Sequence, residues 1–192
     1  IEPELAERQD IRPLRIGIIN IMPLGMQYEF NLLHPLGLSP LQIEPVWIRL
    51  QSHDYKTWDH DHLDQQYRSW EQANASASLD GLIITGAPVE HLAYEQVTYW
   101  QEMVELVGIA RTQCASTLGL CWAGFALAYL AGVDIDRFFK YLFWVCLDMP
   151  FASCKCVVTS ITHEPSPGLT VSRSIPFSPL SIDLVSLPDG TA

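Results

Sequence analysis

Hydrophobic and polar positions along the chain form short apolar runs separated by longer amphipathic stretches. Four runs have the length and β-branched content of buried strands: residues 14–20, 41–50, 79–88 and 114–120. The stretches around them have helical periodicity, over residues 28–37, 61–73, 90–112 and 122–132. Strands that alternate with helices at this spacing predict the α/β class, with a parallel sheet and helices on both faces.

Prolines and apolar spacing refine these elements. Pro45 inside the second run predicts an edge strand or a bulge, because proline has no N–H for an inner sheet ladder. Pro35 and Gly37 are expected to end the helix over 28–37. The long helix over 90–112 places four apolar side chains roughly on one face: Val97, Trp100, Val104 and Val107.

The chain divides into three parts by composition. Residues 1–13 are polar with two prolines and are expected to form an N-terminal arm, followed by an α/β domain over 14–140. Residues 141–192 are rich in Ser, Thr and Pro and lose the periodicity, so no element is predicted there. Because the chain begins with Ile1 rather than Met, we expect a fragment or a processed chain, and the tail composition is what a shifted reading frame would give.

Three residues with chemical potential follow the predicted strands. Asn20 ends the first run, Gly86 lies in the turn after the third, and Cys121 directly follows the fourth. In open parallel sheets the ligand site lies beyond the carboxyl ends of the strands. The sequence therefore places the Cys121 thiol on the expected functional edge.

The stretch Gly-Leu-Cys-Trp-Ala-Gly at 119–124 resembles a nucleophile elbow with cysteine in place of serine. Small neighbours permit a sharp turn, and the N-terminus of the following helix stabilises an anionic sulfur. The N–H groups of Trp122 and Gly86 are candidate oxyanion donors for an acyl intermediate at Cys121. A buried core cysteine is the alternative, because free cysteine is often buried, and the pattern alone leaves both open.

Charge and composition exclude several classes of partner. The formal net charge of −11 argues against nucleic acid, and no apolar run is long enough to span a membrane. Five cysteines, without the spacing of a disulfide framework, predict reduced thiols and a cytoplasmic location. His53, His60 and His62 share a polar stretch, but we interpret it as a solvated loop and expect no metal site.

Five blocks in order resemble the homoserine O-acyltransferases of the MetA type: IRPLRIGIINIMP, SPLQIEPVWIRL, LDGLIITGAPVEHL, VTYWQEM and STLGLCWA, between about residues 11 and 132. The resemblance implies a fold similar to class I glutamine amidotransferases. It also implies that Cys121 takes an acyl group from an acyl-CoA and passes it to the hydroxyl of L-homoserine or L-serine, in methionine or cysteine biosynthesis, with no bound cofactor. A histidine base and a glutamate, from a late His-Pro-Glu motif, complete the family's machinery.

The resemblance also assigns roles to two charged residues. Glu90 follows Gly-Ala-Pro-Val, where family members with glutamate favour acetyl-CoA and those with glycine favour succinyl-CoA. A carboxylate in the acyl pocket would repel the succinyl carboxylate by a few kcal/mol at about 4 Å. Lys140, in KYLFWV, matches a substrate-binding position of the family.

The sequence departs from the family pattern at two places. The family's lysine after Met22 and Pro23 is missing, since residues 24–27 read Leu-Gly-Met-Gln. His-Pro-Glu is absent, and His163 with the adjacent Glu164 has the wrong spacing, so the general base is unassigned. We therefore predict that the acyl-enzyme forms and then stalls. Two alternatives stay open, an impaired relative that lacks the base and a glutamine amidotransferase-like hydrolase, and a homodimer is one assembly considered.

Overall fold

The fold is seen in a computed structural model that describes residue 4 and residues 8–89, 91–132, 157–162 and 169–173. Its elements in chain order are β1 (Leu14–Ile19), α2 (Gly25–Gly37), β2 (Ile43–Ile48), α3 (His60–Gln66), α4 (Trp70–Asn74), β3 (Gly81–Ile84), the 3₁₀ helix η1 (Tyr94–Gln96), α5 (Trp100–Gln113), β4 (Ser116–Leu120), α6 (Trp122–Leu130), β5 (Val157–Thr162) and β6 (Leu169–Arg173). Strands and helices alternate as the sequence predicts.

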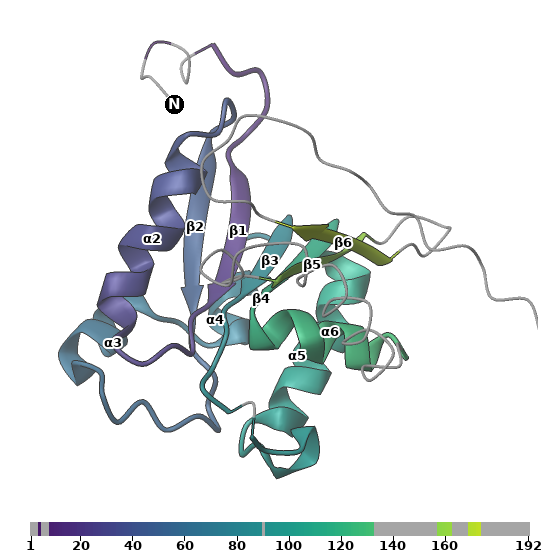
Figure 1. Cartoon of the computed structure of the whole chain (residues 1–192). Helices are drawn as coiled ribbons and strands as arrows, with labels where there is room; N and C mark the ends of the chain where they lie inside the picture. The colour runs from purple at the N-terminus through teal and green to yellow at the C-terminus, as the bar shows by residue number, and fades with distance from the viewer. Residues whose placement is uncertain (1–3, 5–7, 90, 133–156, 163–168, 174–192) are drawn as a thin grey trace, which may run out of the picture.

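A single sheet runs through the molecule in the order β2-β1-β3-β4-β5-β6 (Figure 1). The first four strands pair in parallel, which confirms the predicted α/β class. β5 pairs antiparallel with β4, and β6 antiparallel with β5. These two strands lie within residues 141–192, where the sequence analysis predicts no element, so that expectation is wrong for both segments. The division into arm, domain and tail stays a prediction.

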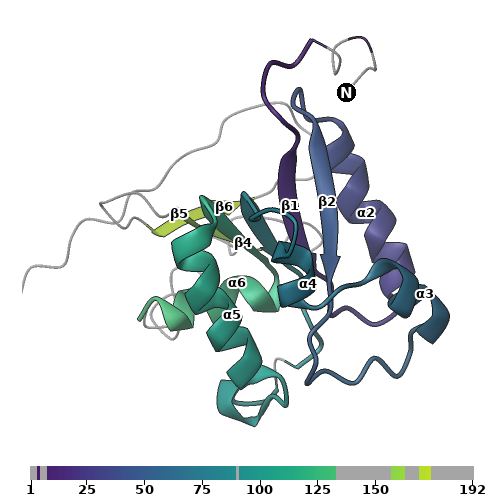
Figure 2. The ribbon, with the colours of Figure 1, turned by 180° about the vertical axis from the view of Figure 1, so that it is seen from behind.

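Helices cover both faces of the sheet, as predicted, with α2 on one side and α4 and α5 on the other (Figures 1 and 2). Alternation along the strands supplies the apolar surface for each face. Ile48 of β2 and Ile84 of β3 are fully buried in the core cluster that includes Trp70 of α4 and Met103 of α5. The core therefore sits mainly between the sheet and the helices that follow β2 and β3.

The segment 61–73 forms two helices, not the single helix that its pattern predicts. Between α3 and α4 the chain returns to the sheet edge, where the Arg68 N–H donates to the Trp47 carbonyl at 3.0 Å and the Arg49 N–H donates to the Arg68 carbonyl at 3.0 Å. Ser69 then caps α4 with its side chain. Pairing with β2 and a new N-cap interrupt the helix, and neither depends on hydrophobic periodicity.

The predicted helix over 90–112 also begins later than expected. A 3₁₀ turn occupies Tyr94–Gln96, and Val97 is buried but extended ahead of α5, which starts at Trp100. The buried face of α5 differs from the predicted one and consists of Trp100, Met103, Leu106, Val107 and Ala110. Val104 is partly buried and packs against this cluster.

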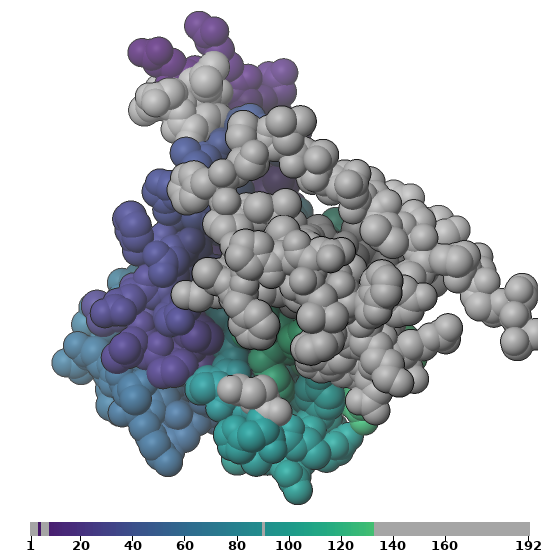
Figure 3. Space-filling view, viewed as in Figure 1, coloured from purple at the N-terminus to yellow at the C-terminus, as the bar shows by residue number. Residues whose placement is uncertain are grey.

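The predictions made from the two prolines near the β2 edge of the sheet have different outcomes. Pro45 lies in β2, which is the edge strand, so the edge prediction is confirmed. Pro35 lies inside α2 and does not end it, whereas Gly37 ends it as predicted; the helix begins at Gly25, before the predicted start at residue 28. α2 forms one side of the molecular surface, drawn in purple in Figure 3, and its Phe30 is 69% exposed. Among the described helices, none has the length and apolar character needed to cross a bilayer.

Candidate active site

The segments that follow β1 and β3 are tied together at the carboxyl edge of the sheet. Asn20 is fully buried, and its Oδ1 accepts hydrogen bonds from the Met22 N–H at 3.3 Å and from the Thr85 hydroxyl at 3.4 Å. The Thr85 Oγ1 in turn accepts from the Ile21 N–H at 2.9 Å. The predicted position of Asn20 at this edge is confirmed, and its contacts fix the two segments against each other.

Cys121 occupies the turn between β4 and α6, as the sequence predicts. Its backbone has φ 55° and ψ −122°, and it is one of two non-glycine residues with positive φ among the described residues. Backbone in such a region is strained by about 1–3 kcal/mol, and this strain is concentrated at functional sites. The side chain is exposed, and the Gly124 N–H donates to the Cys121 carbonyl at 2.9 Å. The thiol is therefore presented at the N-terminus of α6.

Two glycines leave room for this turn. A Cβ at Gly119 would lie 2.7 Å from the carbonyl carbon and oxygen of Ala123, so β4 and the start of α6 approach too closely for any side chain there. A Cβ at Gly86 would lie 3.0 Å from the Cys121 Cβ and 3.5 Å from its Sγ. The backbone after β3 thus lies directly beside the thiol.

The predicted oxyanion donors lie on either side of Cys121. Gly86 is buried next to the sulfur, and Trp122 is the first residue of α6. The first N–H groups of a helix have no carbonyl partner within the helix, which leaves them available to a ligand. Trp122 is held by aromatic contacts, with ring centroids 6.1 Å from Tyr99 and 5.9 Å from Tyr94. The oxyanion roles of both backbone groups stay predictions.

The two described cysteines differ in their surroundings. Cys121 is exposed, whereas Cys114 is buried at the end of α5, and burial raises the pKa of the Cys114 thiol. A raised pKa reduces the fraction of reactive thiolate. The difference favours Cys121 as the nucleophile of this pair.

Several predicted site residues lie outside the described part of the chain. Glu90, the predicted acyl-specificity residue, falls between the described Val89 and His91. Lys140, the predicted substrate-binding residue, and His163 are also outside the described ranges. Their roles stay predictions.

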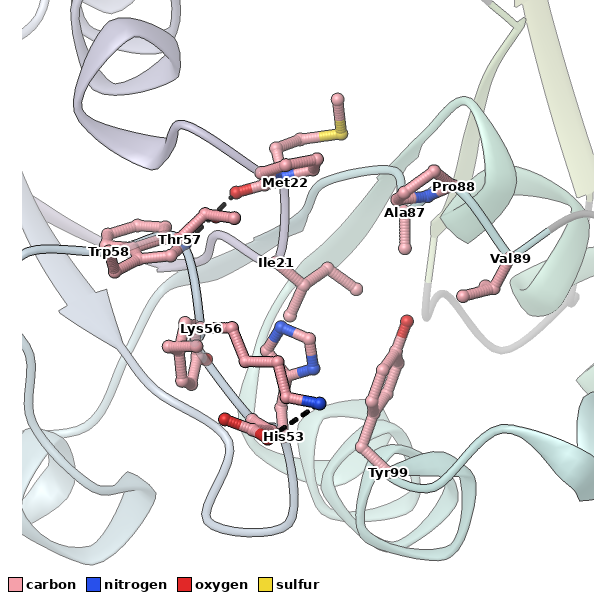
Figure 4. Close-up of a pocket in the computed structure, with 13 residues that line it drawn as sticks. Ile21, Met22, His53, Lys56, Thr57, Trp58, Ala87, Pro88, Val89 and Tyr99 are labelled. Carbon is pink, nitrogen blue, oxygen red and sulfur yellow. Dashed lines mark hydrogen bonds and ion pairs between the residues drawn. The ribbon is translucent and has the colours of Figure 1, made fainter.

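A pocket opens at the same edge of the sheet (Figure 4). We call it the edge pocket; its volume is about 190 Å³, and it is lined by Ile21, Met22, Pro23, residues 53–58, Ala87, Pro88, Val89 and Tyr99. The Trp58 indole N–H donates to the Met22 carbonyl at 3.2 Å, which joins two of its walls. The segment after β3 connects this pocket to the turn at Cys121, because a Cβ at Gly86 would lie 3.5 Å from the Cys121 Sγ and the next three residues line the pocket.

Trp58 of this pocket lies against Gly25, within the segment 24–27 that lacks the family's lysine. A Cβ at Gly25 would lie 1.7 Å from the Cζ2 atom of Trp58, so the indole occupies the space that any side chain at residue 25 would need. Trp58 is buried and packs edge-to-face on Tyr55 and Tyr67, at ring-centroid distances of 5.3 and 5.1 Å. In this chain the Trp58 indole fills the space beside Gly25, the first residue of α2.

The histidines of the 53–62 stretch have separate environments. His53 lines the edge pocket, His62 contacts the Glu29 carboxylate at 2.8 Å, and His60 starts α3. Within the described residues, no group of three or more His, Cys, Asp or Glu side chains could hold a metal ion. The interpretation of this stretch as a solvated loop is wrong for His60 and His62, which lie in α3; His53 lies in a loop but is half-buried, and desolvation lowers its pKa.

Sequence reasoning missed two contributors to this edge. The Glu102 carboxylate, on α5, accepts from the Gln51 N–H at 2.7 Å and the Ser52 N–H at 2.8 Å, and so holds the loop that carries His53. Tyr99, at the start of α5, reaches the pocket with its ring. Both residues lie in the VTYWQEM block, but the block alone assigns them no role, because their roles depend on contacts between segments distant in the chain.

Comparison with known proteins identifies the family. A family model described as homoserine O-succinyltransferase matches residues 1–146. The chain belongs to this homoserine O-succinyltransferase family. The resemblance drawn from the sequence blocks is thereby confirmed.

Relatives in this family carry a related name. "Homoserine O-acetyltransferase" of Jannaschia sp. (strain CCS1) is 46% identical over 125 residues, which are 65% of this chain and 40% of that protein. The protein of the same name from Roseobacter denitrificans is 45% identical over 127 residues, and that from Ruegeria sp. (strain TM1040) is 44% identical over 134 residues. The matched segment spans about 40% of the length of these relatives.

The approach of β4 to α6 predicts a steric effect at Gly119. Gly119→Ala should lower the free energy of unfolding by about 1–3 kcal/mol, because its Cβ meets backbone atoms that cannot move aside. The matched control is Gly108→Ala on the exposed face of α5, where nothing lies within 4 Å of the new Cβ. It should raise stability by about 0.5–1 kcal/mol. Urea titration measures both, and equal effects would contradict the close approach.

The exposed turn predicts selective reactivity of Cys121. Limited iodoacetamide treatment of the folded chain, followed by peptide mapping, should modify Cys121 before the other four cysteines, because it combines exposure with a helix N-terminus. The denatured chain serves as the control and should lose this selectivity. Earlier modification of the buried Cys114 in the folded chain would contradict the arrangement.

Proposed function

We propose that this chain carries the nucleophile of an acyl transfer from an acyl-CoA to the hydroxyl of L-homoserine, with Cys121 as the residue that holds the acyl group. The observation that supports it most directly is the strained, exposed Cys121 at the strand-to-helix turn, with the Gly86 backbone beside its sulfur. A thiol in this position has an open approach and neighbouring backbone N–H groups. L-serine is the second acceptor considered.

The chemistry divides into two half-reactions. The Cys121 thiolate attacks the carbonyl carbon of the acyl-CoA, the N–H groups of Gly86 and Trp122 stabilise the resulting oxyanion, and the bond to the CoA sulfur breaks. CoA leaves as a thiolate that then takes up a proton. In the second half-reaction the homoserine hydroxyl attacks the thioester, gives its proton to a general base, and releases the Cys121 thiolate. The base is unassigned.

The donor we favour is acetyl-CoA. Glu90 directly follows Val89 of the pocket wall in the sequence, and a second carboxylate near it would be repelled. The names of the relatives, homoserine O-acetyltransferase, support the same choice, whereas the description of the family model names the succinyl transfer. Methionine biosynthesis is the pathway that this reaction would serve.

The first test isolates the acyl-enzyme. After incubation of the 192-residue chain with acetyl-CoA, mass spectrometry of peptides should find one acetyl group on Cys121, which L-homoserine does not discharge. A positioned base typically contributes about 10²- to 10⁴-fold to such a step, and the chain has no His-Pro-Glu motif. Cys121→Ala should abolish the adduct and Cys114→Ala should retain it. Rapid multiple turnover would contradict the predicted stall, and absence of any adduct would contradict the proposed function.

A second test concerns donor choice. Acylation of Cys121 should be faster with acetyl-CoA than with succinyl-CoA, and Glu90→Gly should shift the ratio toward succinyl-CoA by removing the repelling carboxylate. Rates of adduct formation under identical conditions provide the measurement. Glu95→Gly, which removes an exposed carboxylate from η1, is the control and should leave the ratio unchanged. Equal use of both donors by the unmutated chain would refute the assignment.

A further inference from the structure

The Tyr99 hydroxyl is a buried polar group without a partner. The residue is only 2% exposed, and its hydroxyl makes no hydrogen bond within the structure described above. An unpaired buried hydroxyl destabilises a folded protein, so such groups are uncommon in cores and call for an explanation. Its position in the wall of the edge pocket suggests that a ligand supplies the partner.

The ring of Tyr99 is fixed on both sides. It lies edge-to-face against His53, with ring centroids 4.8 Å apart, and edge-to-face against Trp122, 6.1 Å apart. In Figure 4 its hydroxyl points away from α5, toward the loop of Ala87, Pro88 and Val89. Because the ring is clamped, the hydroxyl stays directed at the pocket.

The chemistry of the pocket favours an uncharged ligand group. Burial raises the pKa of Tyr99 to about 12, so the hydroxyl is a neutral donor at physiological pH, and desolvation lowers the pKa of His53. The two charged side chains that line the pocket, Lys56 and Asp54, lie 3.3 Å apart as an exposed ion pair and offset each other. A carbonyl oxygen between apolar walls fits this setting better than a carboxylate, which would lose hydration without gaining a cation.

The pocket is adjacent to the thiol but does not contain it. The backbone of Gly86 lies beside the Cys121 sulfur, and the residues that follow it, 87–89, line the pocket. A molecule that reacts at the thiol can therefore extend past Gly86 into the pocket. The reacting carbonyl would stay at the turn, and a second group of the same molecule would reach Tyr99.

We propose that the edge pocket binds the neutral, carbonyl-bearing arm of the acyl thioester donor, and that the Tyr99 hydroxyl donates a hydrogen bond to an amide carbonyl of that arm. The inference rests on the proposed function and deepens it by naming a residue that binds the donor. Tyr99 is a binding residue in this assignment, separate from the groups that contact the reacting carbonyl.

The test compares Tyr99→Phe with Tyr94→Phe, which makes the same change in the same aromatic cluster but outside the pocket. Acylation of Cys121 at low acetyl-CoA should slow about tenfold in Tyr99→Phe, with the rate at saturating donor nearly unchanged, and should not change in Tyr94→Phe. Tyr99→Phe should also leave the urea midpoint of the free protein unchanged or higher, because the hydroxyl has no partner to lose.

Two comparisons separate donor binding from a structural role. With a short acetyl thioester that lacks an amide carbonyl, such as S-ethyl thioacetate, the wild type and Tyr99→Phe should react at equal rates. Tyr55→Phe removes a pocket hydroxyl that does have a partner, the Leu50 N–H at 3.0 Å, and should lower the urea midpoint. A lower midpoint for Tyr99→Phe, or equal slowing with both donors, would overturn the assignment.

The remaining outcomes are also decisive. If Tyr99→Phe is acylated by acetyl-CoA as fast as the wild type, the inference fails while the proposed function stands. A further measurement is the rise in melting temperature that L-homoserine produces. If Tyr99→Phe loses this rise but is acylated normally, the pocket binds the acceptor and the inference is wrong. If the wild-type Cys121 gains no acetyl group, the proposed function fails and the donor assignment falls with it.

Discussion

The backbone at Cys121 takes a conformation that an L-residue adopts at a cost, and the surrounding structure is arranged so that it can persist. β4 passes so close to the start of α6 that residue 119 must be glycine, and the loop after β3 comes so close to Cys121 that a Cβ at Gly86 would be tightly packed, 3.0 Å from the Cys121 Cβ. Trp122 then anchors α6 in an aromatic cluster. Each of these features would be unnecessary if the thiol were an ordinary core side chain.

The parallel sheet converts this local turn into a site. The four parallel strands end at one edge, and the buried Asn20 and Thr85 hold the segments after β1 and β3 in a fixed relation. α5 holds the loop after β2 in place, because the Glu102 carboxylate accepts hydrogen bonds from two backbone N–H groups of that loop. Hydrogen bonds between loops therefore fix the walls of the pocket, while close backbone packing and the aromatic cluster around Trp122 place the thiol.

The strands were predictable because parallel strands covered on both faces read as continuous apolar runs. The ends of the helices were harder to predict than the strands. Arg68 leaves the helical path to pair with β2, and Ser69 starts a new helix, and both events depend on tertiary contacts. β5 and β6 escaped prediction because their segments are short and lie in a stretch rich in Ser, Thr and Pro.

The candidate site also contains residues that the sequence identified and residues that it did not. Cys121 and Gly86 were identified because a small-residue turn after an apolar run has a visible pattern. Tyr99 was not, because the sequence does not reveal whether a hydroxyl will find a partner. It directly precedes Trp100 at the start of α5, and only the packed structure shows its oxygen left unpaired. Features set by residues close together in the sequence could be predicted, and features set by contacts between distant segments could not.

The contact between Gly25 and Trp58 has a consequence for how this sequence can change over time. A lysine at residue 25 meets the indole unless Trp58 has already been replaced by something smaller, while loss of Trp58 alone leaves an empty volume beside Tyr55 and Tyr67. The two positions are coupled, so substitutions at them are not additive. A first substitution at Gly25 produces a clash and a first substitution at Trp58 produces a cavity, so the order of the two replacements decides which cost is met.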